Sequence, residues 1–290
     1  MQNILITGAN GQLGHELTGL SYTHPYKAYK FFRTGREELD IANSEQVNRY
    51  FENHRVDCII NCAAYTGVDK AESNTEEALH VNGYAVEGLV SLAARNNTRF
   101  IHVSTDYVFD GKNHRPYIED DPVNPVSVYG RSKLIGEKAV LDYEHGTVVR
   151  TSWLYSPTGK NFFNTILKIA EEKNELSVVY DQIGTPTYTR DVARVLLALA
   201  LKALDDKDPY TGGLYHYSNE GVCSWYDFAL EIIRLAGKIC KVIPIETIDY
   251  PTPATRPHYS LLSKNKIKSE LSLTIPHWKE SLKGCINQLN

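Results

Sequence analysis

The sequence predicts an α/β fold in which a doubly wound parallel sheet is followed by a smaller C-terminal α/β lobe. The first observation is a short apolar segment, residues 3–7, that ends at a glycine-rich turn and leads into a helical stretch. The second is the regular alternation of strand-like and helix-like segments up to Trp153. The third is that this alternation becomes less regular beyond Trp153. A strand, a glycine turn and a helix at the front of such a chain are typical of a Rossmann-type fold.

The composition argues against several classes of function. Of the 290 residues, 42% are hydrophobic and 23% are charged, as in ordinary globular proteins. The formal net charge of -4, without a block of Lys or Arg, predicts no binding to nucleic acid or to an anionic membrane surface. No apolar run is long enough to span a membrane, and we expect no signal peptide. The five cysteines are scattered, so we expect reduced thiols and a cytoplasmic protein.

The glycine-rich turn after the first strand is the first candidate binding site. Its glycines allow backbone N–H groups to approach a pyrophosphate, and the start of the following helix supplies positive potential. The spacing is GxxGxxG rather than GxGxxG, and a plain helix start is the alternative interpretation. The position of the turn at the front of the chain favours cofactor binding. The predicted contacts are Gly8, Asn10, Gly11, Gln12, Leu13 and Gly14.

The residues after the second predicted strand indicate which cofactor is bound. An NAD-selective site carries an acidic residue here that binds the ribose 2′-hydroxyl. This chain has Arg33 and Arg36 instead, and a guanidinium pairs well with a phosphate. The sequence therefore predicts NADPH, with weaker binding of NADH, although a solvated surface residue is the alternative for Arg36. Asp40 and Ile41 are further predicted cofactor contacts.

Small and polar residues follow the next two predicted strands. Ala63, Ala64 and Tyr65 follow the third strand, and small side chains there let a flat cofactor lie against the backbone. Close strand–helix packing is the alternative. Thr105 follows the fourth strand, and ligands of open parallel sheets lie beyond the strands' carboxyl ends. Its hydroxyl can donate to a substrate oxygen, and capping a turn is its alternative role.

Tyr129 and Lys133 are the central pair of the predicted site. They are four residues apart, so their side chains lie on one face of a helix. A free phenol has a pKa of about 10, and a nearby ammonium lowers it, which makes a tyrosine usable as a general acid or base. Such pairs also occur by chance on solvated helices, so the neighbouring motifs decide in favour of catalysis.

The remaining pattern defines the expected elements and lobes. Up to Trp153 we expect strands near 28–33, 57–61, 99–104 and 147–151, and helices that begin at a Ser44 cap, span 75–96 and run from Tyr129 to about Tyr143. Beyond it we expect helices near 161–172, 188–204, 224–236 and 277–289, and strands near 176–180, 213–218 and 241–245. We expect a dinucleotide-binding domain of residues 1–152, to which part of 185–212 returns, and a mainly substrate-binding lobe of residues 153–290.

These motifs together resemble the extended short-chain dehydrogenase/reductases. Longer strings narrow the resemblance to the dTDP-4-dehydrorhamnose reductases over nearly the whole chain. They are residues 61–66, 68–72, 104–109, 150–153, 181–187, 215–216, 224–226 and 250–257. The resemblance implies NADPH-dependent reduction of the C4 ketone of dTDP-6-deoxy-L-lyxo-4-hexulose (dTDP-4-dehydro-L-rhamnose). That reaction is the last step of dTDP-L-rhamnose synthesis for cell-surface polysaccharide.

The resemblance also implies roles for single residues. Tyr129 donates a proton to the forming alkoxide, Lys133 holds the nicotinamide ribose and lowers the pKa of Tyr129, and Thr105 binds the O4 oxygen. By position, Asp106 and Trp153 contact the sugar. Arg256 is the candidate for the diphosphate, with a loop-fixing salt bridge as the alternative.

One departure from the family concerns metal binding. Some members are described as binding Mg²⁺ across a dimer contact through glutamates. Glu16 matches one such position, but the region around Arg190 offers arginine where a second acid is needed. The ten histidines show no metal-ligand spacing. We therefore expect no metal, and a monomer or a weak homodimer.

Two other functions are compatible with the sequence. One is a different sugar-nucleotide enzyme on the same scaffold, such as a 4-epimerase or a reductase that forms the talose epimer. The other is a non-catalytic, NADP-binding regulatory subunit, although such a protein has no need of a proton donor like Tyr129.

Overall fold

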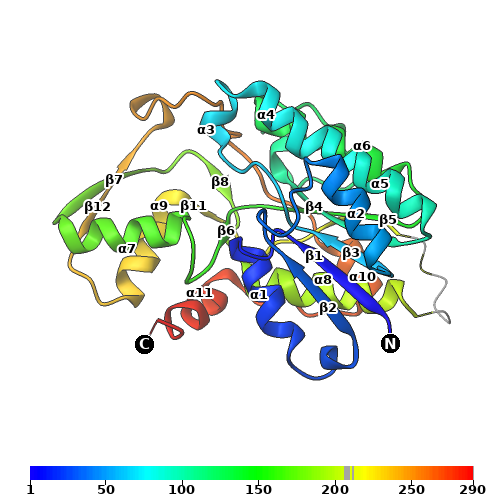
Figure 1. The fold of residues 1–290 in the computed structure, drawn as a ribbon. Helices are drawn as coiled ribbons and strands as arrows, with labels where there is room; N and C mark the ends of the chain where they lie inside the picture. The colour runs from blue at the N-terminus through cyan, green and yellow to red at the C-terminus, as the bar shows by residue number, and fades with distance from the viewer. Residues whose placement is uncertain (206–209, 211, 290) are drawn as a thin grey trace.

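A six-stranded parallel sheet forms the centre of the larger lobe (Figure 1). This computed structural model describes residues 1–205, 210 and 212–289. The strand order is β10-β5-β4-β3-β1-β2, and all neighbouring strands pair in parallel. The strands are β1 (Asn3–Thr7), β2 (Lys30–Thr34), β3 (Cys58–Asn61), β4 (Arg99–Thr105), β5 (Gly146–Thr151) and β10 (Gly213–His216). The order reverses between β1 and β3, as in doubly wound sheets, which confirms the predicted fold class.

Helices cover both faces of this sheet. One face carries α1 (Gln12–Ser21) and α8 (Thr189–Ala203), and the other carries α2 (Ser44–Asn53), α5 (Ala85–Arg95) and α6 (Val128–Leu141). In β1, Ile4 and Ile6 belong to the core on the α1 and α8 side, whereas Leu5 belongs to the core on the other side. A strand that is buried on both faces needs a continuous apolar run, which is why residues 3–7 have one.

The second lobe has a core of its own, at the left of Figure 1. Its parallel pair β7 (Glu175–Val179) and β12 (Lys241–Ile245) packs with α7 (Phe162–Glu172), α9 (Trp225–Leu235) and α11 (Trp278–Ile286). Short strand pairs connect it to the sheet lobe: β6 (Leu154–Tyr155) with β9 (Thr187–Tyr188), and β8 (Ile183–Gly184) with β11 (Cys223–Ser224). Ser224 and Asp227 form a capping box that fixes the start of α9.

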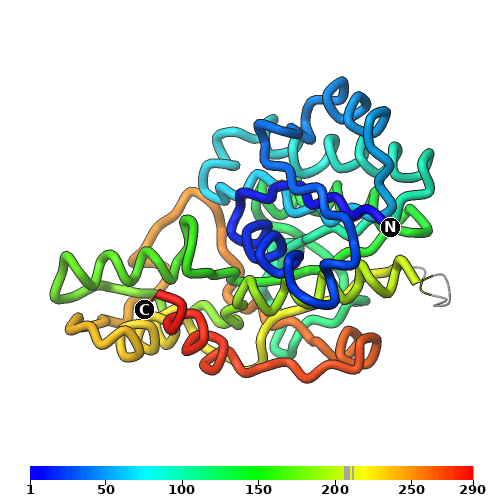
Figure 2. Tube along the Cα trace, turned by 60° about the horizontal axis from the view of Figure 1, so that its bottom comes forward, coloured from blue at the N-terminus to red at the C-terminus, as the bar shows by residue number. Residues whose placement is uncertain are grey.

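The chain passes between the lobes several times, as the tube in Figure 2 shows. After β9 it returns to the sheet lobe as α8, which packs on α1, and then as β10, which pairs with β5. A further helix, α10 (Asn265–Leu271), lies beside β10. We therefore propose that the sheet lobe comprises residues 1–152 together with α8, β10 and α10, which extends the expected return beyond residue 212.

Several elements differ in detail from the sequence expectation. The helix expected over 75–96 consists of α4 (Thr75–Leu79), a π-helical turn (His80–Tyr84) and α5. The N-cap of α2 is Asn43, whose side chain accepts from Gln46 N, rather than Ser44. Short helices not expected are α3 (Val68–Ala71), α10 and the 3-10 turns Tyr26–Ala28, Asp106–Val108 and Thr247–Asp249. Such short elements depend on tertiary contacts and leave little periodicity in a sequence.

Among the described residues, none of the helices combines the length and the apolar character that crossing a membrane requires.

Candidate functional site

A cavity of about 1130 Å³ lies at the carboxyl ends of β1, β3, β4 and β5, where the strand order reverses. This is the position at which open parallel sheets bind their ligands. Most of the predicted site residues line it: Gly8, Asn10, Gly11, Gln12, Leu13, Gly14, Arg36, Asp40, Ile41, Ala63, Ala64, Tyr65, Thr105, Asp106, Tyr129, Lys133 and Trp153. Two predicted residues, Arg33 and Arg256, are not among its lining residues.

The glycine-rich turn has the geometry that a bound pyrophosphate needs. Gly8 has φ +67°, and a Cβ there would lie 2.7 Å from the backbone nitrogen of Ala63. Only glycine therefore allows β1 to turn this closely over the end of β3. The N-cap of α1 is Gly11, and no side chain caps the N–H groups of the first turn. Uncapped N–H groups at a helix start can hold a phosphate group, so the residues present fit a dinucleotide.

The two predicted arginines point to different places. The guanidinium of Arg33 lies over the ring of Tyr22, 4.2 Å from its centroid, and donates to Ser21 Oγ. Arg33 therefore does not line the cavity, because its position in β2 directs it toward the end of α1. Arg36 lies beyond the strand, lines the cavity and donates to Asp40 Oδ2 at 3.1 Å. Its side chain remains 73% exposed, so a phosphate can reach it.

Two polar side chains, those of Thr105 and Asp106, lie at the end of β4. Thr105 Oγ1 accepts from Tyr107 N at 3.2 Å and donates to Asp106 Oδ1 at 3.0 Å, so Thr105 caps a turn and also lines the cavity. Asp106 is 2% exposed, and its Oδ2 atom has no hydrogen-bond partner. Burial raises the pKa of Asp106 to about 7, against hydrogen bonds from Thr105 and Ser260 that favour the carboxylate. A buried carboxylate oxygen without a partner is suited to accept a ligand hydroxyl.

Tyr129 lies in the first turn of α6, which Ser127 caps by accepting from Gly130 N at 3.1 Å. Burial raises the pKa of Tyr129 to about 12, and a hydrogen bond with Thr105 opposes this rise. The expected lowering of this pKa by Lys133 is therefore corrected, because in this structure burial dominates. A phenol with a raised pKa stays protonated at neutral pH, so Tyr129 carries the proton that a general acid must donate.

Lys133 is directed into the sheet side of the cavity. Its Nζ donates to Val103 O at 2.7 Å and lies 3.1 Å from His102 Nε2. Burial lowers the pKa of Lys133 to about 8, while Glu137 and Cys62 oppose the shift. The ammonium is thus held by protein acceptors rather than by Tyr129.

A buried ion pair between α6 and β5 supports the region around Lys133. Arg150 pairs with Glu137, and Ser104 Oγ donates to Glu137 Oε2 at 2.8 Å. Arg150 NH1 also donates to His216 Nε2 at 3.2 Å, and burial beside Arg150 lowers the pKa of His216 to about 3. The neutral ring therefore carries its proton on Nδ1 and donates to Tyr117 O at 3.1 Å.

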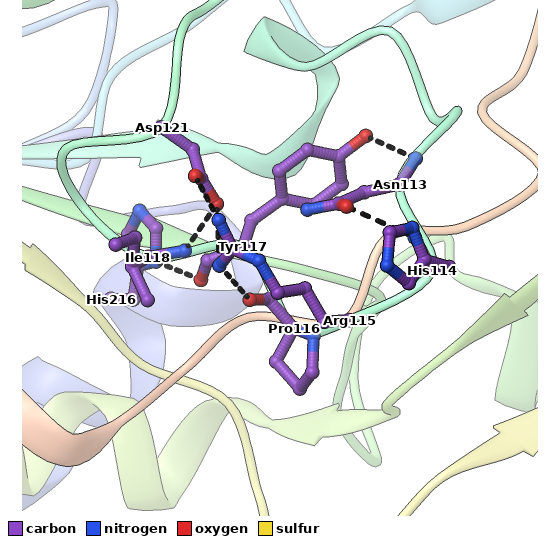
Figure 3. Close-up of polar contacts among 8 residues, drawn as sticks. All are labelled: Asn113, His114, Arg115, Pro116, Tyr117, Ile118, Asp121 and His216. Atoms are coloured by element: carbon purple, nitrogen blue, oxygen red, sulfur yellow. Dashed lines mark hydrogen bonds and ion pairs between the residues drawn. The ribbon is translucent and has the colours of Figure 1, made fainter.

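The same histidine fixes the loop between β4 and α6 (Figure 3). Within that loop Arg115 forms a two-bond ion pair with Asp121, whose Oδ2 also accepts from Ile118 N at 2.9 Å. The ring of Tyr117 stacks on Phe109 with centroids 4.0 Å apart. The loop is consequently ordered beside the cavity and is tied to the ion pair under α6.

The second lobe contributes an aromatic wall. Trp153 has φ +48°, a strained value for a residue with a side chain, and its ring stacks on Trp225 with centroids 3.6 Å apart. Phe162 packs against Trp225 at 4.5 Å and also lines the cavity. Gly184 makes room for this arrangement, because a Cβ there would lie 2.5 Å from Trp153 Cε2.

Arg256 is paired outside the cavity. Its guanidinium donates to both carboxylate oxygens of Asp69, at 3.2 and 2.8 Å, and Asp69 also accepts from Ala254 N. The structure therefore contains the salt bridge given as the alternative for this residue, and the assignment of Arg256 to the diphosphate stays a prediction.

The residues that sequence reasoning missed are the supporting ones: His102, Ser104, Glu137 and Phe162. Two signals were available. Lys133 and Glu137 are four apart on one helix, and His102 and Ser104 alternate on one face of a strand. Across the described residues, His, Cys, Asp and Glu side chains form no group of three suited to a metal ion.

Comparisons with known proteins agree with this geometry. A family model described as RmlD substrate binding domain matches residues 1–290. The spore coat polysaccharide biosynthesis protein SpsK of Bacillus subtilis (strain 168) is 38% identical over 289 residues, covering 99% of this chain and 98% of that protein. A dTDP-4-dehydrorhamnose reductase of Aggregatibacter actinomycetemcomitans is 40% identical over 291 residues, covering 98% of each.

A solved structure is similar over the same length. It is a dTDP-4-dehydrorhamnose reductase from Bacillus anthracis str. Ames in complex with NADP, with a TM-score of 0.92 and 36% identity. The match covers 99% of this chain and 100% of that one. The chain therefore belongs to the RmlD substrate-binding family, that of the dTDP-4-dehydrorhamnose reductases, which confirms the resemblance.

Proposed function

We propose that this protein uses NADPH to reduce the C4 ketone of dTDP-6-deoxy-L-lyxo-4-hexulose, giving dTDP-L-rhamnose in the last step of its synthesis. The observation that carries the proposal is the convergence of Thr105, Tyr129 and Lys133 beside the glycine-rich turn, in one cavity at the switch point of the sheet. The named reductases and the NADP complex among its relatives support the same reaction and cofactor.

Bound NADPH supplies the hydride that adds to C4. Tyr129 donates its phenolic proton to the C4 oxygen as that oxygen gains negative charge, so the ketone becomes an alcohol. Thr105 donates a hydrogen bond to the same oxygen and stabilises the developing charge. Lys133 holds the ribose next to the reacting ring.

The cofactor contacts follow from the lining of the cavity. The glycine-rich turn and the start of α1 hold the pyrophosphate, and Arg36 holds the 2′-phosphate. Ala63 and Ala64 leave a flat surface at the end of β3 for the cofactor. Tyr65, Asp40 and Ile41 complete the nucleotide side of the cavity.

The sugar lies between the two walls of the cavity. Asp106 Oδ2, which has no partner, accepts from a sugar hydroxyl, and the ring of Trp153 packs against the apolar side of the sugar. Arg256 is kept as the proposed contact of the diphosphate, because its pair with Asp69 uses only two of its five N–H groups.

Tyr129→Phe tests the proposal. We expect kcat with the dTDP-linked ketone to fall by about 10²–10⁴-fold, because the proton donor is lost. NADPH affinity should stay close to that of the wild type, and Tyr84→Phe, at an exposed position, should change neither quantity. A variant that kept the wild-type kcat would contradict the assignment of the acid.

The same assay separates the alternatives. Loss of nicotinamide absorbance over many turnovers excludes a 4-epimerase, which returns the hydride to its product. NMR of the product distinguishes the rhamno from the talo sugar. Wild-type protein that binds NADPH but reduces no dTDP-linked ketone would indicate a regulatory subunit.

Location and assembly belong to the proposal as well. The five cysteines are free thiols, which suits a cytoplasmic protein. Glu16 lies close enough to Arg190 for that arginine to lower its pKa, although burial raises it overall. We keep the expectation of a monomer or weak homodimer without a shared metal as part of this proposal.

A further inference from the structure

A chain of buried hydrogen bonds leads from Lys133 through the sheet. Lys133 Nζ lies 3.1 Å from His102 Nε2, His102 Nδ1 lies 3.0 Å from Asn61 Nδ2, and Asn61 Oδ1 lies 2.6 Å from Thr7 Oγ1. These residues come from α6, β4, β3 and β1, and each is at most 2% exposed. Buried polar groups of this kind are costly unless every member has a partner, so their placement limits which protons each can carry.

The surroundings of Lys133 leave two acceptors for its ammonium, His102 Nε2 and Val103 O. The charged group nearest to it on its own helix is Glu137, which Arg150 of β5 and Ser104 of β4 already engage. Cys62 faces it from the end of β3, and burial keeps that thiol protonated by raising its pKa to about 12.

We propose that His102 is a positioning residue for the reduction: its Nε2 accepts a hydrogen bond from the Lys133 ammonium, and Asn61 selects the tautomer that allows this. The inference rests on the role proposed above for Lys133.

The tautomer follows from the donor and acceptor inventory. Burial keeps the pKa of His102 well below its usual value, so the ring is neutral and has a single N–H. An ammonium can only donate; Nε2 must therefore accept, and the proton sits on Nδ1. Nδ1–H then needs an acceptor, which Asn61 supplies when its amide turns its oxygen to His102 and its nitrogen to Thr7.

The structure has the opposite amide orientation, with Asn61 Nδ2 toward His102 Nδ1 and Asn61 Oδ1 toward Thr7 Oγ1, and this orientation suits a different state. There Nδ1 accepts, Nε2 carries the proton, and the proton is donated to a neutral Lys133 amine. The two orientations of one amide thus correspond to the two charge states of Lys133. The ammonium donates to the ribose as a charged group, whereas the neutral amine is a weaker donor.

The hydrogen bond to His102 Nε2 stabilises the charged form of Lys133, and this determines the effect of pH. Burial already lowers the pKa of Lys133 to about 8, and loss of the Nε2 acceptor destabilises the charged form further. The pKa therefore falls, by about one to two units for a hydrogen bond to a charged group. Functions that need the ammonium are lost as pH rises through this pKa, so their alkaline limit moves to lower pH.

A pair of variants tests the proposal. His102→Gln can carry its amide oxygen to the place of Nε2, whereas His102→Asn keeps a polar group near Nδ1 but does not reach Lys133. We measure NADPH affinity by fluorescence from pH 6 to 10, together with the thermal stability of each variant. The alkaline limit should fall by about one to two pH units in His102→Asn and stay near the wild-type value in His102→Gln. If the alkaline limit of NADPH affinity were the same in both variants, and both lost the same thermal stability, His102 would have a merely structural role.

A second measurement uses the wild-type protein, so it does not depend on whether a variant folds. NMR of ¹⁵N-histidine-labelled wild-type protein at pH 7 should show His102 protonated on Nδ1 and bare at Nε2. An Nε2–H ring at that pH would overturn the proposal. Neither measurement uses the sugar, so a protein that fails to reduce the dTDP-linked ketone would refute the proposed function while leaving this inference separately testable.

Discussion

The wall of the cavity that the sheet lobe supplies is polar and held by hydrogen bonds, whereas the wall that the second lobe supplies is held by stacked rings. The polar wall consists of Thr105, Asp106, Tyr129 and Lys133, which rest on the buried groups of β4 and α6. In the aromatic wall, Trp153 and Phe162 line the cavity, and Trp225, which is not a lining residue, packs against both rings. We propose that the two walls have different roles: the polar wall fixes protons and charges at the reacting carbon, and the aromatic wall contributes affinity and excludes water.

In the polar wall, the buried carboxylate of Asp106 should lower the stability of the folded protein. The variant Asp106→Asn measures this effect. The folded-state pKa of Asp106 is about 7, and an unfolded aspartate has a pKa of about 3.9. Between these values the folded protein binds more protons than the unfolded one, so this group lowers stability as pH rises. The variant should match the wild type near pH 4 and exceed its free energy of unfolding by roughly 2–4 kcal/mol at pH 8.

Urea unfolding at both pH values checks this, with Asp142→Asn at the exposed end of α6 as the control. The variant should also lose part of its kcat/KM, because a carboxylate that accepts from the sugar is gone. A gain in stability that is the same at pH 4 and pH 8 would mean that the buried charge is not its source.

The aromatic wall should respond differently, and Trp225→Leu tests it. Removal of the stacking partner leaves Trp153 free to turn, and an aromatic pair contributes about 0.5–1.5 kcal/mol. We expect KM for the sugar substrate to rise by roughly threefold to tenfold while kcat changes little. Steady-state kinetics measure both, and Leu230→Ala, exposed on the same helix, is the control. A fall in kcat without a change in KM would remove the distinction between the walls.

The smallest effect is expected at the far end of the cavity, from Arg36→Ala. Its side chain is largely exposed, so its contact with a 2′-phosphate is screened by solvent. NADPH affinity should fall by roughly threefold to fivefold and NADH affinity should not change. Arg33→Ala is the matched control, because that guanidinium points to Ser21 and Tyr22. Equal losses for both cofactors in Arg36→Ala would remove the argument for the 2′-phosphate.

Local patterns predicted the elements that carry the reaction. The apolar run, the glycine turn and the Tyr129–Lys133 spacing each depend on neighbours in the chain, and the structure has them in the expected places. The direction of a side chain was harder to predict. Arg33 and Arg36 are three residues apart, yet strand alternation turns one toward α1 and the end of the strand leaves the other at the cavity.

Long-range contacts account for most of the remaining differences. Nothing near Arg256 in the chain reveals that Asp69 will pair with it, since the two are separated by 187 residues. The pKa of Tyr129 likewise depends mainly on burial by distant segments, and the lysine one helical turn away is not among the groups that shift it. The positions of β10 and α10 in the sheet lobe follow from pairing and packing, not from local composition.

The return of α8 and β10 to the first lobe has a consequence for synthesis on the ribosome. The face of the sheet that α8 covers stays bare until about two-thirds of the chain has emerged, and the edge of β5 stays open until β10 follows. A nascent chain that stops at residue 152 therefore presents an apolar surface and a free strand edge, both prone to aggregation. The larger lobe is completed late, together with the smaller one.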